Sequence, residues 1–227
     1  AVQMYTLRDH GTLDEQLAAV QAAGVTAVET VGMQDSTAED LSAKLQEYGI
    51  EAISTHAQLA DLRADAQAVI DHVGDRTVEA ILLTHAHNDH CELAPEAAKR
   101  FDTEVYLHPD DDMLWQESNG DAPYTPLADR GQFDIGGEKI TVYHTPGHSP
   151  GCVVLYVDGT LLSGDTLFNG GPGATGRKYS DFDVIIESLR NVVFNLPDDT
   201  KVLPGHGDAT TVGAEAARID EYIERGY

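Results

Sequence analysis

The chain has 227 residues, 39 of them acidic and 14 basic, which gives a formal charge of −25 at pH 7. This charge argues against binding to nucleic acids and to anionic membranes, because both need clustered lysine and arginine. The acidic residues are spread along the chain, and salt would screen their mutual repulsion. A halophilic source and an ordinary acidic enzyme are therefore two open hypotheses.

Cys91 and Cys152 are the only two cysteines, too few for a disulfide framework. We interpret both as reduced, buried side chains and therefore expect a cytoplasmic protein. No stretch reaches the ~18 apolar residues of a membrane helix, and the first ten residues contain no apolar signal core. We expect no membrane partner, and the sequence leaves the oligomeric state open.

Residues 1–62 alternate between strand and helix patterns. The predicted strands are Val2–Leu7, Thr26–Val31 and Glu51–Thr55, and the predicted helices are Thr12–Ala23 and Thr37–Tyr48. Thr12 and Glu15 have the spacing of a capping box, and the alternation predicts βαβ units with a parallel sheet. A piece this small buries too little apolar surface to be stable alone. We therefore expect it to share one parallel sheet with a helix at Leu62–Val73 and a strand at Val78–Thr84.

The segments VQMYTLRD, AVETVG and EAISTHAQL in this region resemble the opening of xylose isomerase-like TIM barrels. The resemblance would place Glu29 and His56 at the C-terminal ends of strands, where barrel active sites gather. The later strands that carry most metal ligands in that family are missing, so we do not expect isomerase chemistry. Residues 1–62 are predicted to be a (βα)₂β barrel-like fragment.

Seven histidine and aspartate residues in four short motifs have the character of metal ligands. The motif THAHNDH follows the apolar run Ala80–Leu83, and single ligands follow in TPGHSPG, LLSGDTLF and LPGHG; the seven are His85, His87, Asp89, His90, His148, Asp165 and His206. Each motif is bounded by a strand-like run or by Gly and Pro, which predicts loops at strand ends. Imidazole and carboxylate together suit zinc, iron or manganese. Seven ligands are enough for two ions with Asp165 between them.

From about residue 101 the pattern predicts short strands and then two helices. The strands are Thr103–Leu107, Lys139–Tyr143, Val153–Val157 and Thr160–Ser163, and the helices are Ser180–Val193 and Val212–Arg225. The segment Asp111–Leu127 contains several Pro and Gly residues and is predicted to be irregular, either a substrate-facing loop or a plain connector.

The four ligand motifs, in this order, resemble the metallo-β-lactamase-fold hydrolases, specifically their glyoxalase II-like branch. The resemblance runs from about residue 62 to the C-terminus and implies an α/β fold, an αββα sandwich over residues 63–227. It implies one divalent ion on His85, His87 and His148, a second on Asp89, His90 and His206, and Asp165 shared between them. Zinc is the metal we expect first, with iron and manganese as alternatives. Because the barrel-like fragment replaces the family's opening strands, we interpret the chain as an engineered or recombined chimera.

This ligand set predicts hydrolysis of a small acyl substrate, such as a thioester or related ester. Two ions ~3.5–4 Å apart lower the pKa of a shared water to ~7 and polarise a carbonyl, and Asp89 would also orient the hydroxide. A thioester suits such a site because its thiolate leaves without a strong general acid. Two alternatives stay open: a non-catalytic or weakly active metal-binding chimera, and a persulfide dioxygenase with a single iron.

Arg177, Lys178 and Tyr179 end a glycine-rich segment that follows the GDTLF motif. Their two positive charges suit a substrate carboxylate, which Arg binds through two hydrogen bonds and Lys as a point charge. The alternative is that they only offset the nearby Asp181 and Asp183. The region lies near the substrate entrance in the family that the chain resembles, so we predict a substrate-binding role.

Overall fold

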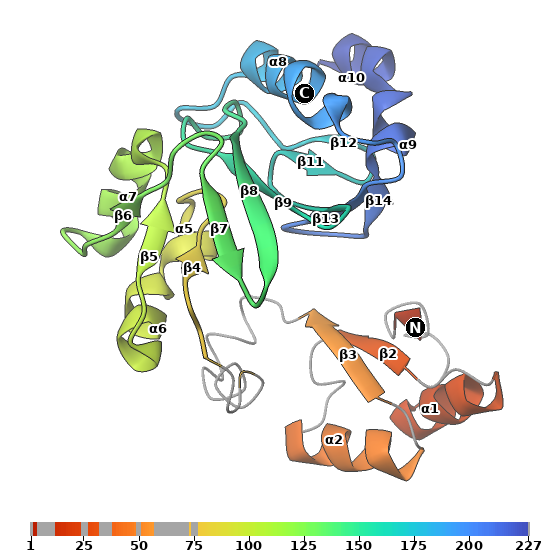
Figure 1. Cartoon of the computed structure of the whole chain (residues 1–227). Helices are drawn as coiled ribbons and strands as arrows, with labels where there is room; N and C mark the ends of the chain where they lie inside the picture. Colours follow the sequence, from red (N-terminus) through yellow and green to blue (C-terminus); the bar gives the residue numbers. More distant parts are fainter. Residues whose placement is uncertain are drawn as a thin grey trace. The chain divides into compact units, whose positions relative to one another are not determined.

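The computed structural model describes residues 2–3, 12–23, 27–31, 38–48, 51–56, 73 and 77–226. These belong to two compact units, residues 1–76 and residues 77–227. Figure 1 colours the first unit red to orange and the second yellow to blue. Each unit has its own β-structure.

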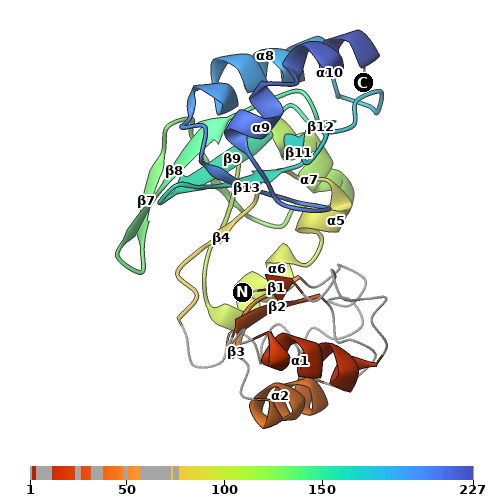
Figure 2. The same cartoon turned by 90° about the vertical axis from the view of Figure 1, so that its right-hand side faces the viewer.

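The first unit contains a three-stranded parallel sheet with two helices on one of its faces (Figures 1 and 2). The strands are β1 (Val2–Gln3), β2 (Ala27–Val31) and β3 (Glu51–His56), in that order, and the helices are α1 (Leu13–Ala22) and α2 (Ala38–Glu47). The predicted alternation of strand and helix and the parallel pairing are confirmed for these residues.

Helix α1 begins with the capping box that its sequence predicts. Glu15 N donates to Thr12 Oγ1 at 3.4 Å, and Thr12 N donates to Glu15 Oε2 at 2.7 Å. Leu17, on the inner face of α1, is fully buried. Lys44 of α2 lies 2.5 Å from the Asp14 carboxylate, so a polar contact also links the two helices.

The strand that leads into the first ligand motif, β4 (Ile81–Leu82), belongs to a different sheet from β1–β3. β4 is parallel to β5 (Val105–Leu107), which is parallel to β6 (Thr125–Pro126). Directly after β4, Thr84 O accepts a hydrogen bond from Val153 N at 2.8 Å. The backbone groups around β4 are thus satisfied within the second unit, and the single parallel sheet that we predicted is not found among the described strands.

The largest sheet of the second unit has six strands. In spatial order they are β14 (Thr210–Thr211), β13 (Lys201–Pro204), β10 (Thr160–Gly164), β9 (Val153–Val157), β8 (Glu138–His144) and β7 (Gln132–Ile135). Neighbours are antiparallel except β10 and β13, which are parallel and therefore end at the same edge. β7 and β8 form a hairpin through Gly136 and Gly137, whose φ angles of 61° and 86° are those of a two-residue hairpin loop.

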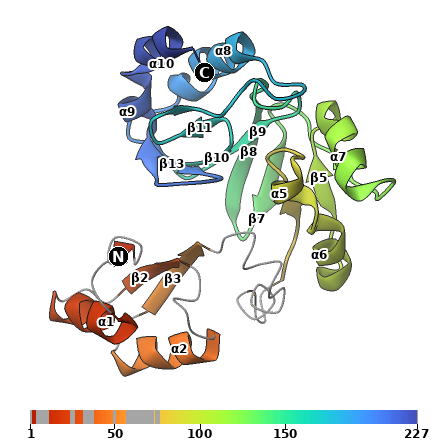
Figure 3. The same cartoon turned by 180° about the vertical axis from the view of Figure 1, so that it is seen from behind.

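The two sheets of this unit lie between two groups of helices (Figures 1 and 3). On the six-stranded sheet lie α8 (Phe182–Asn191), α9 (Val212–Ala216) and α10 (Ile219–Arg225); beside the three-stranded sheet lie α5 (Asn88–Cys91), α6 (Ala94–Phe101) and α7 (Asp112–Asn119). Strand β9 contributes to two cores, because successive side chains point to opposite faces. Val154 packs with Ile185 and Leu189 of α8, whereas Val153 and Leu155 pack with side chains of both sheets. This is the αββα layering that the sequence predicts.

Some elements differ from the prediction. The segment Asp111–Leu127 is not irregular, because it contains α7, whose buried Trp115 donates Nε1–H to Ala122 O at 2.8 Å. The expected single helix at Val212–Arg225 is divided into α9 and α10. The helices α5 and α6 and the hairpin of β11 (Leu167–Phe168) and β12 (Gly171–Pro172) were not predicted. Of the predicted helix at Leu62–Val73, all but Val73 lies outside the described residues.

The lengths and composition of the helices bear on membrane association. Within the described part of the chain, no helix is both long and apolar enough to cross a membrane.

Candidate metal centre

The run HAHNDH is divided between a loop and a single helical turn. His85 and His87 lie on the loop that follows β4, and His87 is the N-cap of α5. Asp89 and His90 lie in the first turn of α5, which is held by the hydrogen bond from His90 N to His87 O at 2.9 Å. This loop and turn therefore supply four of the candidate ligands from only six consecutive residues, 85–90.

The other three predicted ligands come from separate strand ends. His148 lies between β8 and β9, Asp165 follows β10, and His206 follows β13. Because β10 and β13 are parallel neighbours, Asp165 and His206 leave the sheet at the same edge. Gly205 makes this approach possible, since a Cβ there would lie 2.4 Å from Asp165 Oδ1.

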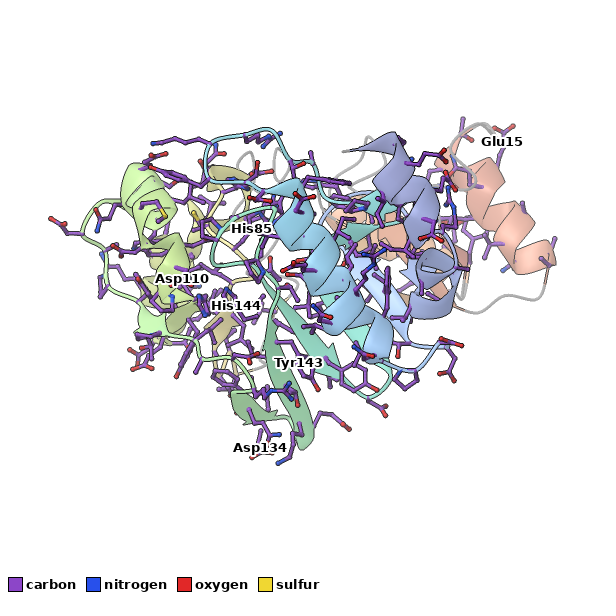
Figure 4. All side chains as sticks on the ribbon, turned by 90° about the horizontal axis from the view of Figure 1, so that it is seen from above. Glu15, His85, Asp110, Asp134, Tyr143 and His144 are labelled. Carbon is purple, nitrogen blue, oxygen red and sulfur yellow. The ribbon has the colours of Figure 1, made fainter. Side chains whose placement is uncertain are left out.

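The structure brings all seven side chains into one cluster, with His85 in the interior (Figure 4). Within it, candidate ligand atoms lie within 4.8 Å of one another in three overlapping groups: His85, His87 and His148; His85, His90 and Asp165; Asp89, His90 and His206. The first and third groups are the two ligand sets that the sequence predicts. The second group contains Asp165 together with one histidine from each of these two sets.

Asp165 lies between these two sets. Its Oδ1 is 3.5 Å from His90 Nε2, and its Oδ2 is 3.5 Å from His148 Nε2 and 3.7 Å from His206 Nε2. Asp89 belongs to one side only, with Oδ2 at 3.4 Å from His206 Nε2 and 3.6 Å from His90 Nε2. The carboxylate expected to be shared thus lies within 3.7 Å of histidine nitrogens from both ligand sets, and its Oδ2 is near one nitrogen of each set.

Four buried atoms in the cluster have no hydrogen-bond partner among the described residues: His85 Nε2, His87 Nδ1, His148 Nε2 and Asp165 Oδ1. Leaving such atoms unpaired is costly, and a native structure with several in one place indicates an ion or another ligand. The orientation of His148 is also set for ligation, because Nδ1–H donates to Ala174 O at 2.8 Å and leaves the Nε2 lone pair free. The donor set fits a divalent metal.

Burial keeps several of these histidines neutral. The pKa of His85 lies well below its usual value, because burial and the neighbouring His90 disfavour the charged form. Burial also lowers the pKa of His87 and of His90, although Asp165 and Asp89 oppose the shift of His90. A neutral imidazole has the lone pair that a metal requires.

The predicted substrate-binding residues Arg177, Lys178 and Tyr179 lie on the loop between β12 and α8. The Lys178 ammonium is 3.0 Å from Glu117 Oε1 of α7 and lies 4.5 Å from the centre of the Tyr179 ring. The charge of Arg177 contributes to lowering the pKa of His87, after the larger effects of burial and His148, while Asp111 acts in the opposite direction.

A further group of possible ligands, His108, Asp110 and His144, does not have the geometry of a metal site. The two imidazoles stack in parallel, with ring centroids 3.9 Å apart and an angle of 13° between the planes, so no ion can lie in both ring planes. The nitrogens nearest Asp110 are also engaged, because His108 Nδ1 accepts from Asp110 N and His144 Nε2 donates to Pro150 O. Figure 4 shows Asp110 and His144 side by side.

Sequence reasoning missed the residues that support the ligands. Asp111 is fully buried beside the first ligand loop, although it lies in a segment predicted to be irregular. Both cysteines are free and buried, as predicted, and each contacts the ligand loops: Cys91 Sγ donates to Ala86 O at 3.3 Å, and Cys152 Sγ lies 3.1 Å from Ser149 Oγ. Burial raises the pKa of the Cys152 thiol to about 12, so this side chain stays protonated.

Residues 54–206 match the family model of the metallo-β-lactamase superfamily, a range that covers more than half of the chain and contains all seven candidate ligands. The chain belongs to the metallo-β-lactamase superfamily. Membership implies a centre that binds divalent metal, in agreement with the histidine and aspartate cluster.

Three relatives illustrate the similarity. The chain is 36% identical over 151 residues to the probable metallo-hydrolase YqgX of Bacillus subtilis (60% of this chain, 72% of the relative). It is 29% identical over 178 residues to the hydroxyacylglutathione hydrolase GloC of Haemophilus influenzae (70% and 84%). Among solved structures, TTHA1623 in a di-iron-bound form is 34% identical, with a TM-score of 0.60 (67% and 82%).

The first 53 residues lie outside the matched family model. The resemblance of this region to sugar-isomerase barrels, and the interpretation of the chain as a chimera, stay predictions from the sequence.

Proposed function

We propose that the chain is a dinuclear metal-dependent hydrolase of the glyoxalase II-like type, acting on a thioester or a related acyl ester. The observation that carries this proposal is the position of Asp165, whose carboxylate lies 3.5 Å from a histidine nitrogen of each predicted ligand set, His148 in one and His90 in the other. One set is made of His85, His87 and His148. The relative named hydroxyacylglutathione hydrolase supports a thioester as the substrate class.

In this proposal His85, His87 and His148 hold one ion, Asp89, His90 and His206 hold the other, and Asp165 contacts both. A pair of divalent ions, when bound, supplies Lewis-acid activation of a water and of a carbonyl. Zinc suits the donors best, and iron or manganese fit the same ligand types. The di-iron form of the related TTHA1623 keeps iron in consideration.

The protein side chains have separate tasks. Asp89 lies at the more open side of the cluster and is placed to accept a proton from the attacking water and to hold it in line. Arg177 is assigned the binding of an anionic group of the substrate, because it lies on the loop that also carries Ala174, the hydrogen-bond partner of His148. Ala174 O, through its hydrogen bond to His148 Nδ1, keeps that imidazole oriented.

The test combines metal analysis with a substrate panel. Protein purified without chelator should hold two ions per chain and hydrolyse an acyl-glutathione thioester faster than a β-lactam. Asp165→Ala should bind fewer than two ions per chain, with lower occupancy of both sites, and should lose most of the turnover. Oxygen consumption with a persulfide and one iron per chain would favour the dioxygenase alternative, and metal binding without turnover of any compound would favour the non-catalytic chimera.

The role of Arg177 is tested against its neighbour. Arg177→Ala should raise KM for an anionic acyl substrate by ~10-fold or more with little change in kcat, which corresponds to ~1.4 kcal/mol of binding. Lys178→Ala is the matched control, because it removes the same charge from a side chain that is paired with Glu117. Equal effects of both variants would show that only the local charge matters.

A further inference from the structure

Asp111 is a fully buried carboxylate that no step of the proposed chemistry uses. It lies at the end of the short 3₁₀ helix η2 (Pro109–Asp111), just before α7. Its Oδ2 accepts hydrogen bonds from Ala86 N at 2.9 Å and from Ser149 Oγ at 2.8 Å, and its Oδ1 accepts one from Gly151 N at 2.6 Å. A buried charge is tolerated because each oxygen is hydrogen-bonded.

The three donors belong to the two loops that present the three-histidine set, His85, His87 and His148. Ala86 lies between the first two of these histidines, and Ser149 follows the third directly. A single carboxylate therefore connects the β4–α5 loop to the β8–β9 loop, in which Ser149 and Gly151 lie 63 and 65 residues after Ala86. Asp111 is thus hydrogen-bonded to both loops beside the three histidines.

The fit around Asp111 allows little adjustment. A Cβ on Gly151 would lie 2.6 Å from Asp111 N and 2.7 Å from its Cγ, so only glycine permits the contact. The β8–β9 loop is also closed on itself, with Gly147 N donating to Ser149 O at 3.0 Å. Asp111 thus binds the β8–β9 loop at a point where the loop backbone is held by its own hydrogen bond.

One member of the second ligand set, His206, depends on other contacts. His206 lies on the loop after β13, where Gly205 N donates to Gly164 O at 2.8 Å. That hydrogen bond connects His206 to β10, not to the loops that Asp111 holds. His206 is therefore supported by a part of the second unit that Asp111 does not contact, whereas Asp89 and His90 lie on α5, directly after the β4–α5 loop.

We propose that Asp111 is a positioning residue for the three-histidine set: it holds the β4–α5 and β8–β9 loops at the spacing that one metal ion requires and favours that ion by its negative charge. The inference rests on the ligand assignment made in the proposed function. Its test measures metal affinity and not turnover, so an inactive protein with the expected affinities would refute the proposed reaction and leave this role intact. Partners that orient metal ligands typically contribute 10–100-fold to affinity.

The decisive variant is Asp111→Asn, which keeps the size of the side chain but replaces one acceptor oxygen by a donor. Dissociation constants for zinc are measured by competition with a chromophoric chelator, and cobalt absorption reports the geometry of the bound ion. In a His206→Ala background, which removes one ligand of the second set, Asp111→Asn should weaken the binding of zinc to the three-histidine set ~10–100-fold. Its neighbour Asp110→Asn removes the same charge from an exposed side chain and should change the affinity less than ~2-fold.

A second variant covers the case in which Asp111→Asn fails to fold. Ser149→Ala removes only the hydroxyl that donates to Asp111 and should weaken the same ion several-fold while near-UV circular dichroism stays native. Unchanged affinity in Ser149→Ala and in folded Asp111→Asn overturns the proposal. Equal weakening of both ions by Asp111→Asn also overturns it, because the effect would then be a general loss of stability.

Discussion

The unpaired Nε2 of His85 should lower the stability of the folded protein when no metal is bound and raise it when metal is bound. Without an ion, a polar atom buried in the cluster costs stability, and with an ion the energy of binding becomes energy of folding. We therefore expect chelator to lower the melting temperature of the native chain by several degrees. His85→Ala should melt at the lower temperature regardless of chelator, and re-added zinc should restore only the native chain. Identical melting of the native chain with and without chelator would contradict this expectation.

His108 provides a pH dependence away from the ligand cluster. Burial, together with the stacked His144, holds the pKa of His108 below its usual 6.5. Below pH ~6.5 the unfolded chain therefore binds a proton at His108 more readily than the folded chain does. The contribution of His108 to stability is complete above that pH and is lost as the pH falls, by at most ~1.4 kcal/mol per pH unit for one proton.

The variant His108→Asn separates this effect from that of other groups. Asparagine can still accept the hydrogen bond from Asp110 N that caps η2, but it does not titrate. Urea unfolding at pH 7.5 and pH 5.5 should show a smaller loss of stability for His108→Asn than for the native chain. An equal loss would mean that His108 becomes protonated without cost in the folded protein.

The C-terminal helices hold the hairpin that follows Asp165. Glu215 of α9 is buried and accepts hydrogen bonds from Gly170 N at 3.2 Å, from Thr210 Oγ1 at 2.6 Å and from the Tyr222 hydroxyl of α10. Arg225 of α10 donates to Gly170 O at 3.0 Å. One carboxylate thus fixes α9 and α10 against the β11–β12 hairpin.

Removing the charge of Glu215 should therefore loosen several elements together. We expect Glu215→Gln to lower the free energy of unfolding by ~1.5–3 kcal/mol, the usual contribution of a hydrogen bond to a charged group. Glu224→Gln, on an exposed position of α10, should change it by less than ~0.5 kcal/mol. Urea denaturation of both variants is the measurement, and similar values for the two would disprove the role of Glu215.

Elements with a regular local pattern were predicted well. β9 has the bounds Val153–Val157 that its run of β-branched and aromatic residues predicts, and α1 begins at its capping box. α7 was missed because the prolines and glycines that follow it suggested an irregular segment, whereas burial of Trp115 stabilises the helix. The ligand motifs could be found because each is a short local pattern. Asp111 could not, since its three partners lie 25 to 40 residues away in the chain.

The formal charge of −25 acts on the whole molecule. Like charges at this density repel one another and oppose the compact state, and the Debye length falls from ~10 Å at 0.1 M salt to ~3 Å at 1 M. We expect the melting temperature to rise between 0.1 M and 2 M KCl, a salt chosen because it is less strongly excluded from protein surfaces than sulfate. A melting temperature that is constant or falls would argue against the halophilic hypothesis and for an ordinary acidic enzyme.

The hydrogen bond from His148 Nδ1 to Ala174 O joins a ligand to the loop that also carries Arg177. If the loop shifts when a substrate reaches Arg177, the basicity and orientation of His148 shift with it. Thermodynamic linkage then requires reciprocity: an occupant that strengthens metal binding must itself bind more tightly when metal is present, and by the same factor. In the proposed enzyme, the metal centre and the loop with Arg177 would therefore form one cooperative unit, in which the affinity of each site depends on the occupancy of the other.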